Sequence, residues 1–118
     1  LIIEAATERE EIKNAIFDKA GKVLAVDAVM ASNTSSIPIT RMANHSPDPA
    51  RFIGLHFFNP VPVMGLIEVI PGLATSQDTT DRVTAFARGL GKEVVLSQDE
   101  PGFVVNRILL PMINEAVF

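Results

Sequence analysis

Residues Phe52-Ile53-Gly54-Leu55-His56-Phe57-Phe58 form a short apolar run with one ionisable side chain, and Asn59-Pro60 follows it. An apolar run of this length, bounded by turn-forming residues, predicts a β-strand. A second strand is predicted over Leu66-Ile67-Glu68-Val69-Ile70, which also carries one ionisable side chain. Side chains two residues apart share one face of a strand. If the two strands are neighbours, His56 and Glu68 can therefore meet.

The chemistry of this pair admits two interpretations. A buried carboxylate without a partner is costly, so Glu68 needs a hydrogen-bond donor, and His56 can supply it. A carboxylate that holds one imidazole N–H fixes the tautomer and leaves the other ring nitrogen as a general base. A purely structural histidine–glutamate hydrogen bond would produce the same pattern. The strand pattern alone does not decide between these two interpretations, because pairs of residues with perturbed pKa values are common at active sites but also occur elsewhere.

Strand and helix signals alternate along the rest of the chain. Further apolar runs predict buried strands over residues 1–5 and 28–31 and a last strand over residues 94–96. Between them lie predicted helices, one of which is short, covers residues 37–43 and has Pro38 in its first turn. Alternating strands and helices predict an α/β sheet.

The two longer helices have start signals and apolar stripes. Thr7 and Glu10 have the spacing of a capping box, and Gly21 marks the end of that helix. Its predicted inner face is Ile12, Ala15, Ile16 and Ala20. Ser76 is the predicted N-cap of the other, whose apolar stripe is Val83, Phe86, Ala87 and Leu90.

The C-terminal part differs from the rest. Residues 97–102 form a polar turn, which we take as a domain boundary. From Phe103 to Phe118 the sequence is apolar nearly all round, which predicts a buried helix, and Pro111 is expected to kink it. The first and last elements have no lead-in and no cap, so we expect the chain to be a piece of a longer protein.

Two further polar residues have competing interpretations. Ser35 follows a predicted strand, at the place where ligands bind in open α/β sheets. Alternatively, a hydroxyl of residues 34–36 caps the next helix, and Ser36 has the better spacing for that role. Asn106 lies in an apolar helix, so its amide must be hydrogen-bonded, and from the pattern we favour a partner within the fold.

Three other residues have simple structural interpretations. Asn59 precedes Pro60 and is first of all a turn former. Glu8 lies in the first turn of a predicted helix, where a carboxylate suits the helix dipole. Lys13 is most simply a solvated charge on a helix face.

Composition excludes several classes of function. The chain has 118 residues, 47% of them hydrophobic, which suits one small folded domain. Lys+Arg total 10 and Asp+Glu total 14, so the net charge is −4, which argues against nucleic-acid or membrane partners. Without cysteine there is no disulfide or thiolate metal site, and we expect no metal. No glycine-rich phosphate loop is present in these residues.

Taken together, four strings resemble the (S)-3-hydroxyacyl-CoA dehydrogenase family. In chain order they are Ala31-Ser32-Asn33-Thr34-Ser35-Ser36, Gly54-Leu55-His56-Phe57-Phe58-Asn59-Pro60, Leu66-Ile67-Glu68-Val69-Ile70 and Pro101-Gly102-Phe103-Val104-Val105-Asn106-Arg107. Ile3-Glu4-Ala5, Glu8 and Lys13 also fit the family. The turn over residues 61–64 is most similar to the stand-alone short-chain 3-hydroxybutyryl-CoA dehydrogenases.

The resemblance implies an NAD-dependent oxidation of a 3-hydroxyacyl-CoA to a 3-ketoacyl-CoA. It implies that His56 is the general base, that Glu68 orients it and stabilises its imidazolium, and that Ser35 lies near the substrate oxygen and the cofactor. It also implies that Asn106 polarises the reacting oxygen. By the same resemblance, Glu8, Lys13, Ser35 and Asn59 contact NAD. A poised base and a hydrogen-bond donor are what this reaction needs.

The family's architecture implies further expectations. Residues 1–98 would be the C-terminal portion of a Rossmann-like NAD-binding domain, and residues 99–118 the start of an all-helical substrate-binding and dimerisation domain. The glycine-rich loop would precede Leu1, so we expect the isolated chain to be inactive and to bind NAD weakly. An acyl-CoA substrate, a homodimer, fatty-acid or butanoate metabolism with β-oxidation, and a cytoplasmic or mitochondrial-matrix location are also implied.

Two alternative functions stay open. Lens λ-crystallin, a structural protein, resembles the same family, so the fold could serve without turnover. A related β-hydroxyacid dehydrogenase could act on a smaller acid without CoA. The presence of His56, Glu68, Ser35 and Asn106 argues against a purely structural role.

Overall fold

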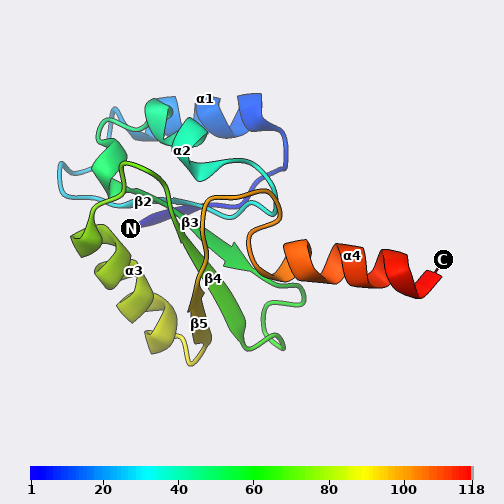
Figure 1. Ribbon diagram of the computed structural model, residues 1–118. Helices are drawn as coiled ribbons and strands as arrows, with labels where there is room; N and C mark the ends of the chain where they lie inside the picture. The colour runs from blue at the N-terminus through cyan, green and yellow to red at the C-terminus, as the bar shows by residue number, and fades with distance from the viewer. Residues whose placement is uncertain (118) are drawn as a thin grey trace.

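The computed structural model describes residues 1–117, and a five-stranded sheet in the order β1-β2-β3-β4-β5 is at its centre (Figure 1). The strands are β1 (Ile2–Glu4), β2 (Met30–Ser32), β3 (Phe52–Phe57), β4 (Leu66–Pro71) and β5 (Glu93–Leu96). The first three run parallel, β4 runs antiparallel to β3, and β5 runs parallel to β4. The predicted α/β class is confirmed, as are the five predicted strands.

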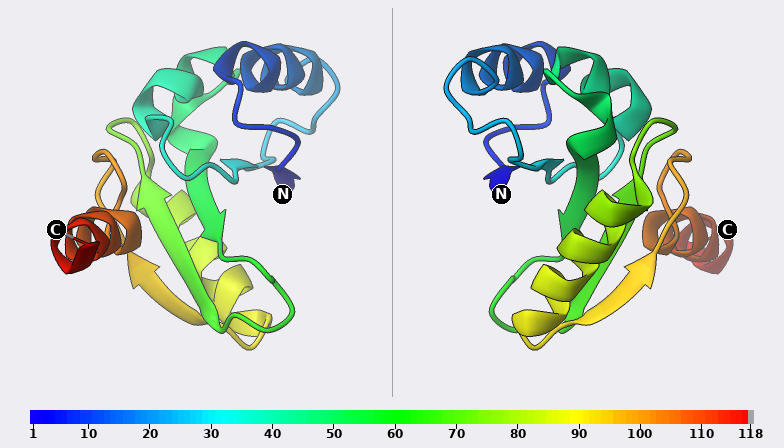
Figure 2. Two further views of the ribbon diagram at one scale, coloured as in Figure 1. Left: turned by 90° about the vertical axis from the view of Figure 1, so that its right-hand side faces the viewer. Right: turned by 90° about the vertical axis from the view of Figure 1, so that its left-hand side faces the viewer.

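Helices cover both faces of this sheet. On one side lie α1 (Glu10–Ala20) and the short α2 (Ile39–Met42), which the 3₁₀ turns η1 (Ala43–His45) and η2 (Pro49–Arg51) follow. On the other side lies α3 (Gln77–Gly89), as Figure 2 shows. The last helix, α4 (Val105–Val117), extends away from the sheet (Figure 1).

Side-chain alternation along the strands divides the core into two clusters. The cluster under α1 and α2 consists of Phe17, Met30, Ile37, Ile39, Met42, Ala43, Phe52, Ile70 and Phe103. The cluster under α3 consists of Val29, Ala31, Ile53, Leu55, Ile67, Val69, Val83 and Ala87. His56 and Glu68 belong by alternation to the first face, so the site lies at the end of the layer that α1 and α2 cover.

The predicted first strand is less buried than expected. Leu1 is 51% exposed, and Ile2 and Ile3 are only partly buried. The reason is that β1 forms the edge of the sheet within residues 1–117 and pairs there with β2 alone. Glu4, the charged residue of this strand, is the buried one.

The predicted start of α1 is wrong, and its inner face is confirmed only in part, since Ala20 packs against the core. The helix begins at Glu10 with Arg9 as its N-cap, and the Thr7 hydroxyl accepts the N–H of Arg9 instead of forming a capping box. The fully buried residues of α1 are Lys13 and Phe17, whereas Ile12 of the predicted stripe is 39% exposed. Lys13 turns inward because it has a buried partner, described below, and this partner sets the rotation of the helix. Gly21 does follow the last helical residue, as predicted.

The expected cap of the short helix is also wrong. Ser36 does not cap α2; the carboxylate of Asp99 accepts the N–H groups of Ile39 and Thr40, both at 2.7 Å. It also accepts the Thr40 hydroxyl at 2.6 Å. This acceptor lies about 60 residues away in the sequence, in the predicted boundary segment. Asp99 thereby fastens that segment to the start of α2.

The predicted cap of α3 is confirmed, and its stripe is confirmed in part. The Ser76 hydroxyl accepts the Thr79 N–H at 3.2 Å. Val83 and Ala87 are buried, but Phe86 and Leu90 are 39% and 49% exposed. The remaining buried positions of this helix are Thr79 and Thr80, because its first turn faces η2, where the Ala50 carbonyl accepts the Thr79 hydroxyl.

The helix that was predicted as buried from Phe103 begins at Val105 and is exposed, although Phe103 itself lies in the core. No residue of α4 is buried, since nothing else in residues 1–117 covers it, and Pro111 lies inside one continuous helix. Phe118, the end of the predicted helix, lies outside the described residues. None of the helices within residues 1–117 has the length and apolar character that crossing a membrane requires.

Gly54 provides a test of the packing next to His56. A Cβ atom there would lie 2.7 Å from Ile39 Cδ1 and 2.9 Å from Ile70 Cβ. We therefore expect Gly54→Ala to lower the free energy of unfolding by about 1–3 kcal/mol through overpacking. The measurement is urea unfolding of the complete polypeptide that carries this sequence, called the whole protein below. Gly65→Ala is the matched control, because no atom lies within 4 Å of its Cβ position; equal midpoints for the two variants would contradict the prediction.

Candidate active site

His56 and Glu68 face each other directly across β3 and β4. They are register partners, as the alternation argument predicted for neighbouring strands. His56 is 5% exposed and Glu68 is fully buried. Nδ1 of His56 lies 3.8 Å from Oε2 of Glu68, and neither atom has a hydrogen-bond partner within residues 1–117. The two atoms are therefore about 1 Å further apart than a hydrogen bond requires, and they become an ion pair only when His56 is protonated.

Ser35 lies on the other side of the same imidazole. Its Oγ is 3.1 Å from Nε2 of His56, and the residue is exposed. When Nδ1 carries the proton and faces Glu68, Nε2 is an acceptor, and the Ser35 hydroxyl can donate to it. The structure thus joins Ser35, His56 and Glu68 in one line of polar contacts that leads from the surface into the sheet.

Burial keeps the imidazole neutral. Burial lowers the pKa of His56 from its usual 6.5, and the nearby carboxylates of Glu68 and, more weakly, Glu8 oppose this without reversing it. The rings of Phe58 and Phe103 lie 4.6 Å and 5.7 Å from the imidazole, centroid to centroid. His56 is therefore unprotonated at neutral pH and can accept a proton.

Glu8 fixes the turn that carries Ser35. One of its carboxylate oxygens accepts the Ser35 N–H at 3.0 Å, and the other accepts the Thr34 hydroxyl at 2.9 Å. The predicted place in the first helical turn is wrong, because Glu8 precedes α1, which begins at Glu10. The segment before α1 therefore reaches across to the end of β2.

A buried ion pair lies beneath this turn. Nζ of Lys13 is 2.6 Å from Oε2 of Glu4, and the same oxygen accepts the Ser32 hydroxyl at 3.0 Å. Nζ also donates to the Asn33 carbonyl at 3.1 Å. The simple interpretation of Lys13 as a solvated charge is wrong, because the side chain is fully buried. Through its hydrogen bond to the Asn33 carbonyl, Lys13 fixes the end of β2.

Asn33 joins the ends of β2 and β3. Its side-chain oxygen accepts the Phe57 N–H at 2.9 Å, next to His56. Neither Asn33 nor Glu4 was predicted as a functional residue from the sequence. The signal for Glu4 was available, since it is one charged residue in an apolar strand, as His56 and Glu68 are. No local pattern distinguishes Asn33 from its polar neighbours.

The two asparagines of the prediction lie at the margins of the site. Asn59 is exposed, in the loop that follows β3. Asn106 is the second residue of α4 and is half-buried. Its neighbour Val105 donates its N–H to Oε1 of Glu68 at 2.9 Å, which attaches the start of α4 to the histidine–glutamate pair.

The end of the sheet at which the carboxyl termini of the parallel strands lie suits a nucleotide cofactor. The carboxyl ends of the parallel strands β1, β2 and β3 meet here, which is where ligands bind in open α/β sheets. The exposed residues Glu8, Ser35 and Asn59 follow those ends and offer carboxylate, hydroxyl and amide groups to a ribose or a carboxamide. Among residues 1–117 no cluster of three His, Asp or Glu side chains is placed to hold a metal ion.

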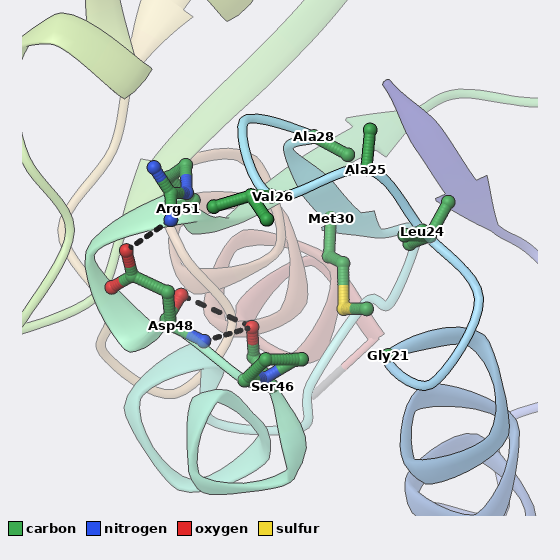
Figure 3. Close-up of a pocket in the computed structure, with 10 residues that line it drawn as sticks. Gly21, Leu24, Ala25, Val26, Ala28, Met30, Ser46, Asp48 and Arg51 are labelled. Carbon is green, nitrogen blue, oxygen red and sulfur yellow. Dashed lines mark hydrogen bonds and ion pairs between the residues drawn. The ribbon is translucent and has the colours of Figure 1, made fainter.

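A pocket of about 210 Å³ lies elsewhere in the molecule (Figure 3). Leu24 and Met30 line it, and Asp48 and Arg51, an ion pair at 2.8 Å, also contribute to its wall. Met30 begins β2 and Arg51 directly precedes β3, so the pocket lies at the amino ends of these parallel strands. It is therefore separate from the residues around His56.

Comparisons with known proteins agree with the geometry. The family described as "3-hydroxyacyl-CoA dehydrogenase, NAD binding domain" matches residues 1–100. A 3-hydroxybutyryl-CoA dehydrogenase of Bradyrhizobium diazoefficiens is 53% identical over 118 residues, which are all of this chain and 40% of that relative. The human mitochondrial hydroxyacyl-coenzyme A dehydrogenase is 48% identical over 117 residues, 99% of this chain and 37% of that relative.

A solved structure matches equally well. The crystal structure of (S)-3-hydroxybutyryl-CoA dehydrogenase from Ralstonia eutropha superposes with a TM-score of 0.94 at 52% identity. The match covers 97% of this chain and 40% of that one. The chain thus spans about two fifths of the length of the relatives that it matches.

Replacing Lys13 tests how much the buried Lys13–Glu4 pair contributes to stability. Lys13→Met leaves the Glu4 carboxylate buried without a cation, so we expect the free energy of unfolding of the whole protein to fall by about 3–5 kcal/mol. Arg41→Met is the matched control, because Arg41 forms an ion pair with Glu10 at the surface and its loss should cost less than about 1 kcal/mol. Chemical unfolding of both variants gives the comparison. A similar small loss in both would show that Lys13 is not what holds this turn.

Proposed function

Since the chain belongs to the 3-hydroxyacyl-CoA dehydrogenase family, through its NAD-binding domain, we propose that the whole protein oxidises an (S)-3-hydroxyacyl-CoA to the 3-ketoacyl-CoA with NAD. The observation that carries this proposal is the buried His56, with Glu68 at one ring nitrogen and the exposed Ser35 at the other. The names of the relatives support a short-chain substrate such as 3-hydroxybutyryl-CoA.

The proton has a defined route in this arrangement. Nε2 of His56 is the ring nitrogen directed toward Ser35 and away from Glu68. A substrate hydroxyl placed beside Ser35 can pass its proton to Nε2, because the lowered pKa of His56 keeps this nitrogen free. The Ser35 hydroxyl then positions the substrate oxygen.

Glu68 stabilises the product of that proton transfer. Once protonated, the imidazolium needs a counter-charge, and the unpartnered oxygen of Glu68 lies 3.8 Å from Nδ1. NAD bound at this site would supply the acceptor for the hydride from C3 of the substrate. Asn106, on the first turn of α4, donates a hydrogen bond to the oxygen as it gains carbonyl character.

The residues that would hold NAD lie along the carboxyl ends of the parallel strands. Ser35 and Asn59 are exposed there and can contact it directly. Glu8 is exposed too, and it orients the Ser35 turn through two hydrogen bonds. Lys13 is buried beneath the turn, so we assign its contribution to holding Ser32 and Asn33 in place for the cofactor.

We also propose that the domain boundary lies between residues 98 and 99, with α4 as the start of a helical domain that binds substrate and forms a homodimer. The end of the family match at residue 100 and the exposed apolar side chains of α4 support this division. A role in fatty-acid or butanoate metabolism stays a prediction, as does a cytoplasmic or mitochondrial location.

Replacing the base tests the proposed reaction. We expect His56→Gln in the whole protein to lower acetoacetyl-CoA-dependent NADH oxidation by about 10²–10⁴-fold, because in this reverse direction the imidazolium of His56 is the group that returns the proton to the substrate oxygen. NADH binding, measured by fluorescence titration, should not change. Retained turnover would refute His56 as the base.

The same assay decides between the alternatives. A structural protein of the λ-crystallin type would show no turnover before any substitution. A β-hydroxyacid dehydrogenase that does not use CoA would have a lower KM for a free 3-hydroxy acid than for its CoA thioester. We expect the thioester to have the lower KM.

A further inference from the structure

The two oxygens of Glu68 contact different parts of the molecule. Oε2 faces Nδ1 of His56 at 3.8 Å and has no hydrogen bond within residues 1–117. Oε1 accepts the backbone N–H of Val105 at 2.9 Å, across 37 residues of sequence. Val105 is the first residue of α4, so one carboxylate contacts both the histidine and a helix that extends from the sheet.

The contact with α4 is electrostatically favourable. The first N–H groups of a helix have no partner within the helix, and the aligned peptide dipoles leave partial positive charge there. Glu68 is fully buried and Val105 is half-buried, so water screens this hydrogen bond less than it would at the surface. The start of α4 therefore competes with the imidazole of His56 for the charge of Glu68.

Among the groups around His56, Glu68 is the carboxylate whose interaction with the imidazole can change. Glu8, before α1, is the second carboxylate that acts on the imidazole, and it is engaged by the Ser35 turn. Ser35 and the rings of Phe58 and Phe103 are uncharged. On α4 the nearest charged residue in the sequence is Arg107, which is exposed.

We propose that Glu68 is a coupling residue, which transmits the position of α4 to His56 through the Val105 N–H. When the start of α4 is attached, Oε1 is held and Oε2 stays beyond hydrogen-bond distance of Nδ1. When it detaches, the carboxylate is released and can close on the imidazole. The proposal rests on the proposed function only in taking His56 as the base, since the contacts themselves do not depend on the reaction.

Val105→Pro removes this one hydrogen-bond donor. Proline is well accommodated at the first residue of a helix, where its missing N–H breaks no helical bond. Val105→Ala is the matched control, because it shortens the same side chain and keeps the N–H. The readout is the pKa of His56 in the whole protein, measured by NMR titration of its ring signals without substrate or cofactor; His45→Gln assigns them, because the chain has two histidines.

We expect the pKa of His56 to be higher in Val105→Pro than in Val105→Ala by roughly half a pH unit. The acid limb of the kcat/KM profile for oxidation should move to higher pH by the same amount. In a Glu68→Gln background the difference between the two variants should disappear. Equal pKa values in the original background, or a difference that persists without the carboxylate, would overturn the proposal.

A measurement on the unsubstituted protein covers the case in which Val105→Pro does not fold. The amide proton of Val105 should change its chemical shift with the same midpoint as the ring of His56, because the charge of Glu68 redistributes as the imidazole titrates. A Val105 amide that does not respond through this pH range would refute the coupling. If the coupling fails while His56→Gln is still inactive, the proposed function stands; if His56→Gln is active, the base assignment falls instead.

Discussion

The candidate site depends on the buried ion pair between Glu4 and Lys13. Two charges removed from water are costly unless hydrogen bonds satisfy them. Here the Ser32 hydroxyl, the Ala6 N–H and the Asn33 carbonyl complete the network. Because these partners belong to the ends of β1 and β2 and to α1, the pair can form only when all three elements are in place. It therefore fixes the turn on which Ser35 stands.

Several deviations from the sequence prediction follow from this pair. The rotation of α1 that buries Lys13 leaves Ile12 exposed, against the amphipathic pattern. The helix begins at Glu10, later than the capping signal of Thr7 indicated, and Glu8 in the preceding segment binds the Ser35 turn. A prediction from helical periodicity assigns apolar residues to the buried face of a helix. It cannot identify a buried lysine, because the partner of that lysine lies on a neighbouring strand.

The sequence was sufficient to place His56 and Glu68 opposite each other, but the predicted hydrogen bond between them is wrong, because Nδ1 and Oε2 are 3.8 Å apart and the donor to Glu68 is the Val105 N–H. Two strands of period-two alternation placed His56 and Glu68 on inner faces, and the antiparallel register of β3 and β4 brought them opposite each other. Contacts between distant segments could not be predicted in this way. The cap of α2 comes from Asp99, and the donor to Glu68 is a backbone N–H of Val105; both depend on how the chain folds back on itself. The exposure of α4 likewise depends on which other segments pack against it, and the sequence of α4 alone does not show this.

The proposed reaction requires that His56 presents an unprotonated Nε2 to Ser35 while Nδ1–H faces Glu68. The nitrogen-15 chemical shifts of the ring, recorded on the whole protein above the pKa of His56, report which nitrogen carries the proton. We expect the Nδ1–H tautomer, with Nε2 as the unprotonated acceptor. An Nε2–H tautomer would contradict it, because Ser35 would then accept a hydrogen bond and the nitrogen directed toward the surface could not act as a base.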